Sequence, residues 1–192
     1  VRSRGLGDVY KRQFYTGGEA YCQPNIRYRT HQWQFRDDDT RFAGREVLVE
    51  TPYDEADTTG RVRSVVLPNG KRFTWFVDTH FHPTRLVDIS FTGLPERVAA
   101  GDTLRLSLRI DNPYPYNIDL GGDMSLVMLW KHGRFRVKEF DTGERFRIPA
   151  EEEIRREVVF VVPRQLAGTD FDAGFALRRE GYTLSLIHIS EP

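Results

Sequence analysis

The chain has 192 residues, of which 39% are hydrophobic and 12% aromatic, which is enough apolar material for the core of one folded domain. Its 28 basic residues are balanced by 28 acidic ones, so it has no long-range positive field that would attract nucleic acid. No stretch approaches the roughly 20 apolar residues of a membrane-spanning helix, and the single cysteine, Cys22, excludes a disulfide framework and a thiolate metal cluster.

Both ends of the chain have the pattern of translated adapter DNA. One choice of codons for residues 5–13 has a reverse complement that translates, residue for residue, as residues 184–192. The implied DNA resembles the transposon-end adapter of shotgun sequencing libraries. We therefore expect residues 1–13 and 184–192 to be adapter-derived tails outside the fold, and residues 14–183 to be a fragment of a longer protein.

The segment 14–78 has a mixed pattern that is typical of a small α/β remnant of a larger upstream domain. Residues 45–50 alternate between apolar and polar side chains, which predicts a strand. Residues 62–67 and 71–77 flank Pro68-Asn69-Gly70. Because Asn-Gly between two apolar runs favours a tight turn, these residues predict a β-hairpin.

The segment 79–183 consists of one predicted strand after another. Its clearest strand is at residues 103–110, where four apolar side chains alternate with three polar ones: Leu104, Leu106, Leu108 and Ile110 against Arg105, Ser107 and Arg109. Further strands are expected at residues 84–91, 124–130, 133–140, 154–162 and 174–177. The predicted fold class is therefore mainly β, an antiparallel immunoglobulin-like β-sandwich preceded by the α/β remnant, with the sandwich favoured over a barrel.

Residues 27–36 are rich in side chains that hydrogen-bond to and stack on sugars or phosphates. As candidate substrate-binding residues we take Tyr28, Arg29, His31, Gln32 and Trp33. A packed amphipathic strand is the alternative interpretation, because alternation would place Arg29, His31 and Trp33 on one side of such a strand.

A second candidate lies directly after the strand at residues 103–110. In Asn112-Pro113-Tyr114-Pro115-Tyr116 the two prolines remove backbone donors, so the chain must leave the sheet there. Tyr114 and Tyr116 are candidates for stacking on a glycan ring. The favoured interpretation is a rigid corner whose tyrosines close one end of the sandwich.

Metal and catalytic chemistry find little support in the sequence. His80 and His82 would share one face of a strand, but two ligands are too few for a metal site, and we expect a surface pair. The sequence contains no nucleophile elbow, phosphate-binding glycine loop or paired-carboxylate motif, so no catalytic residue is assigned and no cofactor is expected.

Three short strings resemble a known family. These are residues 14–18 (Phe-Tyr-Thr-Gly-Gly), then Tyr28-Arg29 with Gln32-Trp33, then residues 42–47 (Phe-Ala-Gly-Arg-Glu-Val). Together they resemble the C-terminal extracytoplasmic part of membrane glycosyltransferases of Bacteroides-like bacteria, similar to the protein mannosyltransferase and aminoarabinose transferase superfamily. The resemblance covers residues 14–49.

The resemblance implies a parent protein on the periplasmic face of the bacterial inner membrane, held there by many upstream helices. That parent would transfer a sugar from a polyprenyl-phosphate donor to a lipid or protein acceptor. The catalytic acid of the superfamily lies in an early loop, so no catalytic position is carried onto this chain. Tyr15, Gly17, Arg29, Gln32 and Trp33 would belong to the motif, either lining the acceptor side or packing.

A different class of protein is also compatible with the sequence. The β-rich segment could be a secreted or surface immunoglobulin-like module that binds a glycan or a protein without catalysis. The genomic sequence upstream of Phe14 would distinguish the glycosyltransferase from the binding module. A membrane glycosyltransferase requires repeated apolar spans of about 20 residues, whereas a secreted module requires a signal peptide or further β modules.

Overall fold

The computed structural model describes residues 40–51, 63–132, 136–166, 171–179 and 182–183. Apart from two short 3-10 turns, Thr40–Phe42 and Arg164–Leu166, the regular elements of these ranges are β-strands, and the strand pairs are antiparallel. The mainly β expectation is thus confirmed. No helix in the described ranges is long or apolar enough to cross a membrane. The predicted tails, residues 1–13 and 184–192, lie outside the described residues.

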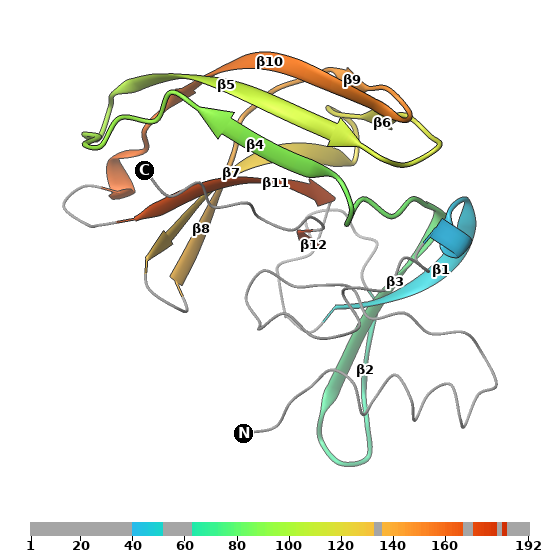
Figure 1. Ribbon diagram of the computed structural model, residues 1–192. Coiled ribbons are helices and arrows are strands. Elements are labelled where there is room, and N and C mark those ends of the chain that lie inside the picture. The colour runs from blue at the N-terminus through green and yellow to red at the C-terminus, as the bar shows by residue number, and fades with distance from the viewer. Residues whose placement is uncertain (1–39, 52–62, 133–135, 167–170, 180–181, 184–192) are drawn as a thin grey trace.

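The first sheet has three strands in the order β1-β3-β2, formed by β1 (Arg45–Thr51), β2 (Arg63–Val66) and β3 (Arg72–Phe81). The turn between β2 and β3 is closed by hydrogen bonds from Leu67 N–H to the Lys71 carbonyl and from Gly70 N–H to the Leu67 carbonyl, which confirms the predicted hairpin. Figure 1 shows that this hairpin projects away from the other sheets.

Residues 14–78 were expected to form a small α/β remnant, but the described part of this segment forms strands. Residues 40–51 and 63–78 contain β1, β2, a 3-10 turn and most of β3, with no α-helix among them. In addition, β3 continues to Phe81, so the boundary expected after residue 78 falls inside a strand. The ladder with β1 continues across that boundary, with a register shift between the Asp78 and Phe81 pairings, and holds residues 72–81 as one strand.

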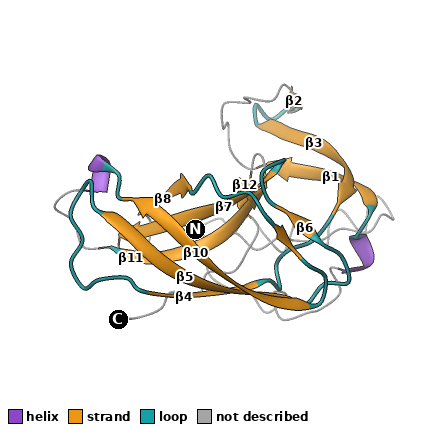
Figure 2. Cartoon of the chain, turned by 90° about the horizontal axis from the view of Figure 1, so that it is seen from above, coloured by secondary structure: helices purple, strands orange, loops and turns teal. Residues whose placement is uncertain are grey.

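The body of the molecule contains two larger sheets. One has the order β10-β5-β4, from β4 (Asp88–Thr92), β5 (Thr103–Asn112) and β10 (Glu152–Val161). The other has the order β12-β11-β7-β8, from β7 (Met124–His132), β8 (Arg136–Asp141), β11 (Asp172–Arg179) and β12 (Tyr182–Thr183). A two-stranded ladder of β6 (Ile118–Asp119) and β9 (Arg147–Ile148) closes one end. The view from above in Figure 2 shows β4, β5 and β10 lying across the second sheet.

The two larger sheets share one apolar core. Strand β5 alternates as predicted, with Leu106 and Leu108 each 1% exposed and Arg105 and Arg109 exposed. Between the sheets, the rings of Phe91 and Phe175 meet edge to face with centroids 5.1 Å apart. The core contains Val87, Ile89, Phe91, Leu104, Leu106, Leu108, Ile110, Leu126, Met128, Trp130, Val158, Phe160, Phe175 and Leu177. Apolar burial of this extent is the main stabilising term for the body.

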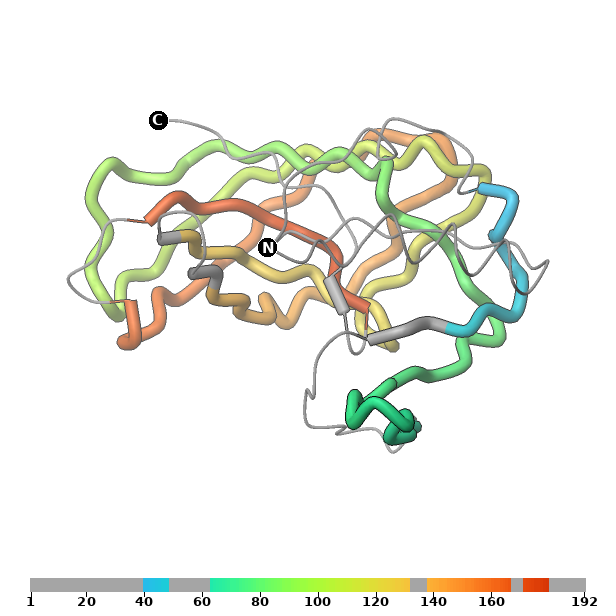
Figure 3. The backbone as a smooth tube through the Cα atoms, turned by 90° about the horizontal axis from the view of Figure 1, so that it is seen from below, coloured from blue at the N-terminus to red at the C-terminus, as the bar shows by residue number. Residues whose placement is uncertain are grey.

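The three-stranded sheet reaches the body through residues 82–87, which link β3 to β4. Figure 3 traces this path from the green end of β3 into the body. The expected strand at residues 84–91 begins only at Asp88, because Thr84 to Val87 form a turn in which Val87 N–H donates to the Thr84 carbonyl at 3.1 Å. This turn brings His82 and Thr84 to the end of the body where β6, β7 and β11 meet.

Candidate functional site

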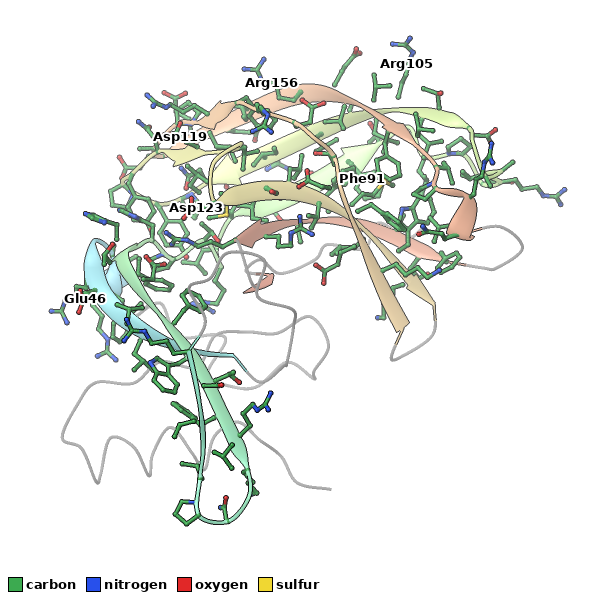
Figure 4. The ribbon with its side chains drawn as sticks, turned by 180° about the vertical axis from the view of Figure 1, so that it is seen from behind. Glu46, Phe91, Arg105, Asp119, Asp123 and Arg156 are labelled. Carbon is green, nitrogen blue, oxygen red and sulfur yellow. The ribbon has the colours of Figure 1, made fainter. Side chains whose placement is uncertain are left out.

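A small polar cavity of about 120 Å³ lies where the link from β3 meets the body. Its walls come from the link, from β6 and its flanks, from the start of β7 and from the end of β11. They are formed by His82, Thr84, Asn117, Ile118, Asp119, Asp123, Met124 and Arg179. Figure 4 labels Asp119 and Asp123, which lie at the same end of the body, the end nearer to Glu46 of β1.

Arg179 organises one wall of this cavity. Its guanidinium forms an ion pair with Asp78 at 2.8 Å between Nη1 and Oδ2, and another with Asp123 at 2.8 Å between Nη2 and Oδ2. The Nη1 contact lacks the angle of a hydrogen bond, and the hydrogen bond of the Asp78 pair runs from Nη2 to Oδ1 at 3.3 Å. Asp78 therefore has its charge neutralised although the residue is buried, which is the usual condition for burying a carboxylate.

Asp119 carries the opposite wall. It lies directly across the β6–β9 ladder from Arg147, which donates from Nε to Oδ1 at 2.7 Å and from Nη2 to Oδ2 at 3.2 Å. The hydrogen bonds from Arg147, followed by the charge of its guanidinium, hold the pKa of Asp119 below its ordinary value. Two carboxylates, of Asp119 and Asp123, and one guanidinium, of Arg179, thus line the cavity, so it suits neutral hydroxyl or amide groups better than a phosphate.

Thr84 supplies a polar atom that the described residues leave unpaired. The residue is 1% exposed, and its Oγ1 has no hydrogen-bond partner within the described part of the chain. A buried hydroxyl without a partner costs about 1–3 kcal/mol. Thr84 is thus a residue of the cavity lining whose hydroxyl has no partner among the described residues.

The two histidines, His80 and His82, each contact neighbouring protein groups. His80 Nδ1 lies 3.0 Å from Thr79 Oγ1, whereas His82 Nδ1 lies 2.9 Å from the His80 carbonyl and the His82 ring packs edge to face on Tyr116. Within the described ranges, no group of three or more His, Cys, Asp or Glu side chains is arranged to hold a metal ion. His80 therefore belongs to the end of β3, and His82 to the link between β3 and β4.

The predicted glycan-stacking residues form a corner of the fold. Asn112 is fully buried, and its Nδ2 donates to the carbonyls of Tyr116 at 2.9 Å and Pro149 at 2.8 Å, while its Oδ1 accepts from Tyr114 N–H. Tyr114 is 1% exposed and accepts a hydrogen bond from Leu86 N–H. The corner interpretation agrees with this geometry, and the stacking hypothesis is wrong for Tyr114, because a buried ring offers no face to a sugar.

Tyr116 is half-buried beside that corner. Its ring stacks on Tyr114 with centroids 5.1 Å apart, and its hydroxyl donates to the Pro83 carbonyl at 2.6 Å. One of its edges already contacts His82 of the polar cavity. Tyr116 therefore fixes the link to β4, and stacking on a glycan stays a prediction for this residue alone.

The other predicted site residues are not among those described. Tyr28, Arg29, His31, Gln32 and Trp33 lie in residues 1–39, outside the described ranges. Conversely, sequence reasoning did not single out Asp78, Thr84, Asp123 or Arg179. The local signal was limited to charged residues next to apolar strand runs, and nothing local indicates that Asp78 and Arg179, 101 residues apart, form a pair.

No protein-family model matches this chain, and no curated protein matches it either. The resemblance to membrane glycosyltransferases therefore stays a prediction that rests on residues 14–49.

Proposed function

We propose that the two facing sheets are an immunoglobulin-like sandwich. The strand orders support this assignment. Sheet β10-β5-β4 corresponds to strands E, B and A of that fold, and sheet β12-β11-β7-β8 corresponds to strands G, F, C and C′. Chain order supports it as well, since β4, β5, β7, β8, β10, β11 and β12 follow one another as A, B, C, C′, E, F and G. Domains of this architecture present their loops at the two ends of the sandwich, and the polar cavity lies at one of those ends.

We further propose that this β-rich region is the extracytoplasmic C-terminal part of a polytopic membrane glycosyltransferase that uses a polyprenyl-phosphate sugar donor. One observation carries the proposal. The last string of the family resemblance, residues 42–47, leads directly into β1: Phe42 is 6% exposed, and Gly44 N–H donates to the Phe81 carbonyl at 2.7 Å. Gly44 has a φ of +73°, which glycine adopts without strain. The string thus has a defined structural role in holding the start of β1 against the end of β3.

In this proposal the described region positions an acceptor and performs no chemistry. The catalytic acid implied by the resemblance belongs to an early loop of the parent protein. The periplasmic location and the lipid or protein acceptor are implied in the same way. Supporting a non-catalytic role, the charged groups around the cavity are already engaged in the Arg179 and Arg147 ion pairs, an arrangement that suits binding.

The test combines genomic extension with activity measurements. The gene upstream of Phe14 should encode repeated apolar spans of about 20 residues. Membranes containing the parent protein should lose transfer activity on Arg29→Ala or Trp33→Ala, whereas Arg105→Ala, an exposed position on β5, should leave it unchanged. A signal peptide in place of the spans, or transfer by the 192-residue chain alone, would contradict the proposal.

A second candidate function is a glycan-binding module without catalysis, and the unpaired hydroxyl of Thr84 favours it. Calorimetric titration with neutral mono- and oligosaccharides tests this function directly. Thr84→Val keeps the shape of the side chain and removes only the hydroxyl, so it should weaken saccharide binding without loss of stability. Thr103→Val, at an exposed position of β5, is the matched control. Equal affinity for both variants would exclude the cavity as a saccharide site.

A further inference from the structure

Exposed apolar side chains gather on the three-stranded sheet. Among the described residues, the large hydrophobic side chains that are exposed are Leu48, Val65, Val66, Leu67 and Val77 on this sheet or its turn, and Val159 and Val161 on β10. Val65 and Val66 are 45% and 63% exposed, and both lie in the distal half of the β2–β3 hairpin. We call Val65, Val66 and Leu67 the hairpin tip. The hairpin that carries it is the part of the described structure that projects farthest from the body (Figure 1).

The strand register places five apolar side chains on one face of the sheet, with Arg63 opposite Trp75 on the same face. Val65 lies opposite Phe73 across the β2–β3 ladder, and Leu48 lies opposite Val77 across the β1–β3 ladder. Since directly opposite residues share a face, these four side chains and Trp75 lie on the same side of the sheet. The rings of Phe73 and Trp75 stack with centroids 5.3 Å apart. These apolar side chains therefore extend from Val65 at the hairpin tip to the Leu48–Val77 pair.

The hairpin is also basic. Residues 63–77 contain Arg63, Lys71 and Arg72 and no Asp or Glu, in a chain whose total charge is balanced. The three cationic residues are exposed, and they flank the hairpin tip in sequence on both sides. Each basic residue close to an anionic lipid surface contributes about 1 kcal/mol to binding. Aromatic side chains next to the cations are typical of segments that lie at the boundary between headgroups and acyl chains.

The arrangement of the tip distinguishes a bilayer from a flat protein partner. Val65 and Val66 are successive strand residues, so their side chains point to opposite faces of the hairpin, and both are exposed. A second copy of the chain packed on one face would leave the other valine in water. A bilayer surrounds an inserted tip on both faces at once and supplies the anionic headgroups that the three basic residues match.

We propose that the β2–β3 hairpin inserts its tip into the headgroup region of an anionic lipid bilayer. Val65, Val66 and Leu67 enter the apolar boundary, Lys71 and Arg72 bind the headgroup phosphates, and Phe73 and Trp75 lie at the interface. The evidence for this contact comes from the surface of the hairpin alone, so it does not depend on the proposed glycosyltransferase function. It is a peripheral contact made by the end of a β-hairpin.

The test is sedimentation of the 192-residue chain with vesicles of phosphatidylcholine alone and of phosphatidylcholine mixed with phosphatidylglycerol. The chain should bind the anionic vesicles, and binding should weaken as salt rises. The double variant Val65→Asp/Leu67→Asp should raise the apparent Kd by at least about tenfold, as should Lys71→Glu/Arg72→Glu at low salt. The matched controls are Val159→Asp/Val161→Asp, which alters exposed valines of β10, and Arg105→Glu/Arg164→Glu, which alters exposed cations of the body. Both controls should bind as the unaltered chain does.

Thermal unfolding of each variant shows whether the fold is retained, and the altered positions are exposed enough that the midpoints should agree. Absence of binding to anionic vesicles would overturn the proposal, as would an equal loss in the hairpin and control variants. Light scattering in solution adds an independent outcome: a dimer that the hairpin variants abolish would identify a second copy as the occupant and would also overturn it. None of these results would bear on whether the parent protein transfers sugars.

Discussion

Arg179 of β11 forms an ion pair with Asp78 of β3 across 101 residues of sequence, and the two side chains are only 12% and 7% exposed. This pair connects the three-stranded sheet to the body. A carboxylate as buried as that of Asp78 needs a compensating charge, and the guanidinium of Arg179 provides it. The end of β11 is therefore tied both to β3 and, through Asp123, to the loop before β7.

We expect Arg179→Met to lower the free energy of unfolding by about 3–5 kcal/mol, because it leaves a buried carboxylate uncompensated. Urea unfolding measures the change. The neighbouring Arg178→Met is the control, since Arg178 pairs with Asp141 nearer the surface, with 3.1 Å between Nη2 and Oδ2, and surface pairs contribute about 1 kcal/mol or less. Equal losses in the two variants would show that the Arg179 pair does not compensate a buried charge.

Leu106→Ala should cost about 2–5 kcal/mol, since Leu106 is 1% exposed and lies in the core shared by the two sheets. Arg105→Ala, on the outer face of the same strand, should cost less than about 0.5 kcal/mol. Chemical denaturation of both variants gives the comparison. A larger loss for Arg105→Ala would mean that the register of β5 is shifted by one residue.

Alanine substitutions at Gly93 and Gly101 distinguish the effect of backbone strain from the effect of steric overlap. Their φ values are +95° and +93°, so an alanine is strained to the same degree at each. A Cβ at Gly93 would lie 2.9 Å from the Arg105 carbonyl oxygen, whereas a Cβ at Gly101 would meet nothing within 4 Å. Gly93→Ala should therefore lower the thermal midpoint more than Gly101→Ala does. Equal midpoints would indicate that the loop before β5 moves aside without cost.

Tyr114→Phe should cost about 1–3 kcal/mol, because it leaves the partly buried Leu86 N–H without the hydroxyl that now accepts its hydrogen bond at 3.1 Å. Denaturant unfolding measures this cost, and a calorimetric titration with saccharides checks that the substitution changes stability alone. An unchanged stability together with altered saccharide binding would restore the stacking role that burial of the ring argues against.

The strands were predictable from sequence where one periodicity dominates. For residues 103–110 the buried and exposed faces were predicted correctly, because strict alternation leaves only one set of side chains that can face the core. The hairpin was predicted from Asn69-Gly70, because this dipeptide strongly favours a tight turn between two strands. The short β6–β9 ladder was missed, since two-residue strands carry no periodicity.

The polar cavity was less predictable than the strands. Its residues come from four separate stretches of the chain, and their proximity depends on how the sheets pack rather than on any local pattern. Thr84 illustrates the difficulty, because alternation assigned it to a strand, whereas the chain turns there and buries the hydroxyl at the cavity wall. Tyr114 is the reverse case, because the flanking prolines already favoured a rigid corner over glycan stacking, and the fold uses the ring to fill that corner.

The Asp119–Arg147 pair should make stability depend on pH in a defined direction. Because Arg147 lowers the pKa of Asp119 in the folded chain, the pair stabilises the fold above the ordinary pKa of about 3.8, and this contribution is lost as the pH falls through the lowered value. Both side chains are more than half exposed, so solvent screening limits the contribution to about 1 kcal/mol or less. The stability difference between the unaltered chain and Asp119→Asn, measured by urea unfolding from pH 7 downward, should therefore be small and positive at neutral pH and vanish in acid. Added salt should reduce it, and Arg147→Gln should abolish it, since the lowered pKa depends on that guanidinium. A difference that grows as the pH falls would mean that Asp119 is stabilised in its protonated form and would contradict the assignment.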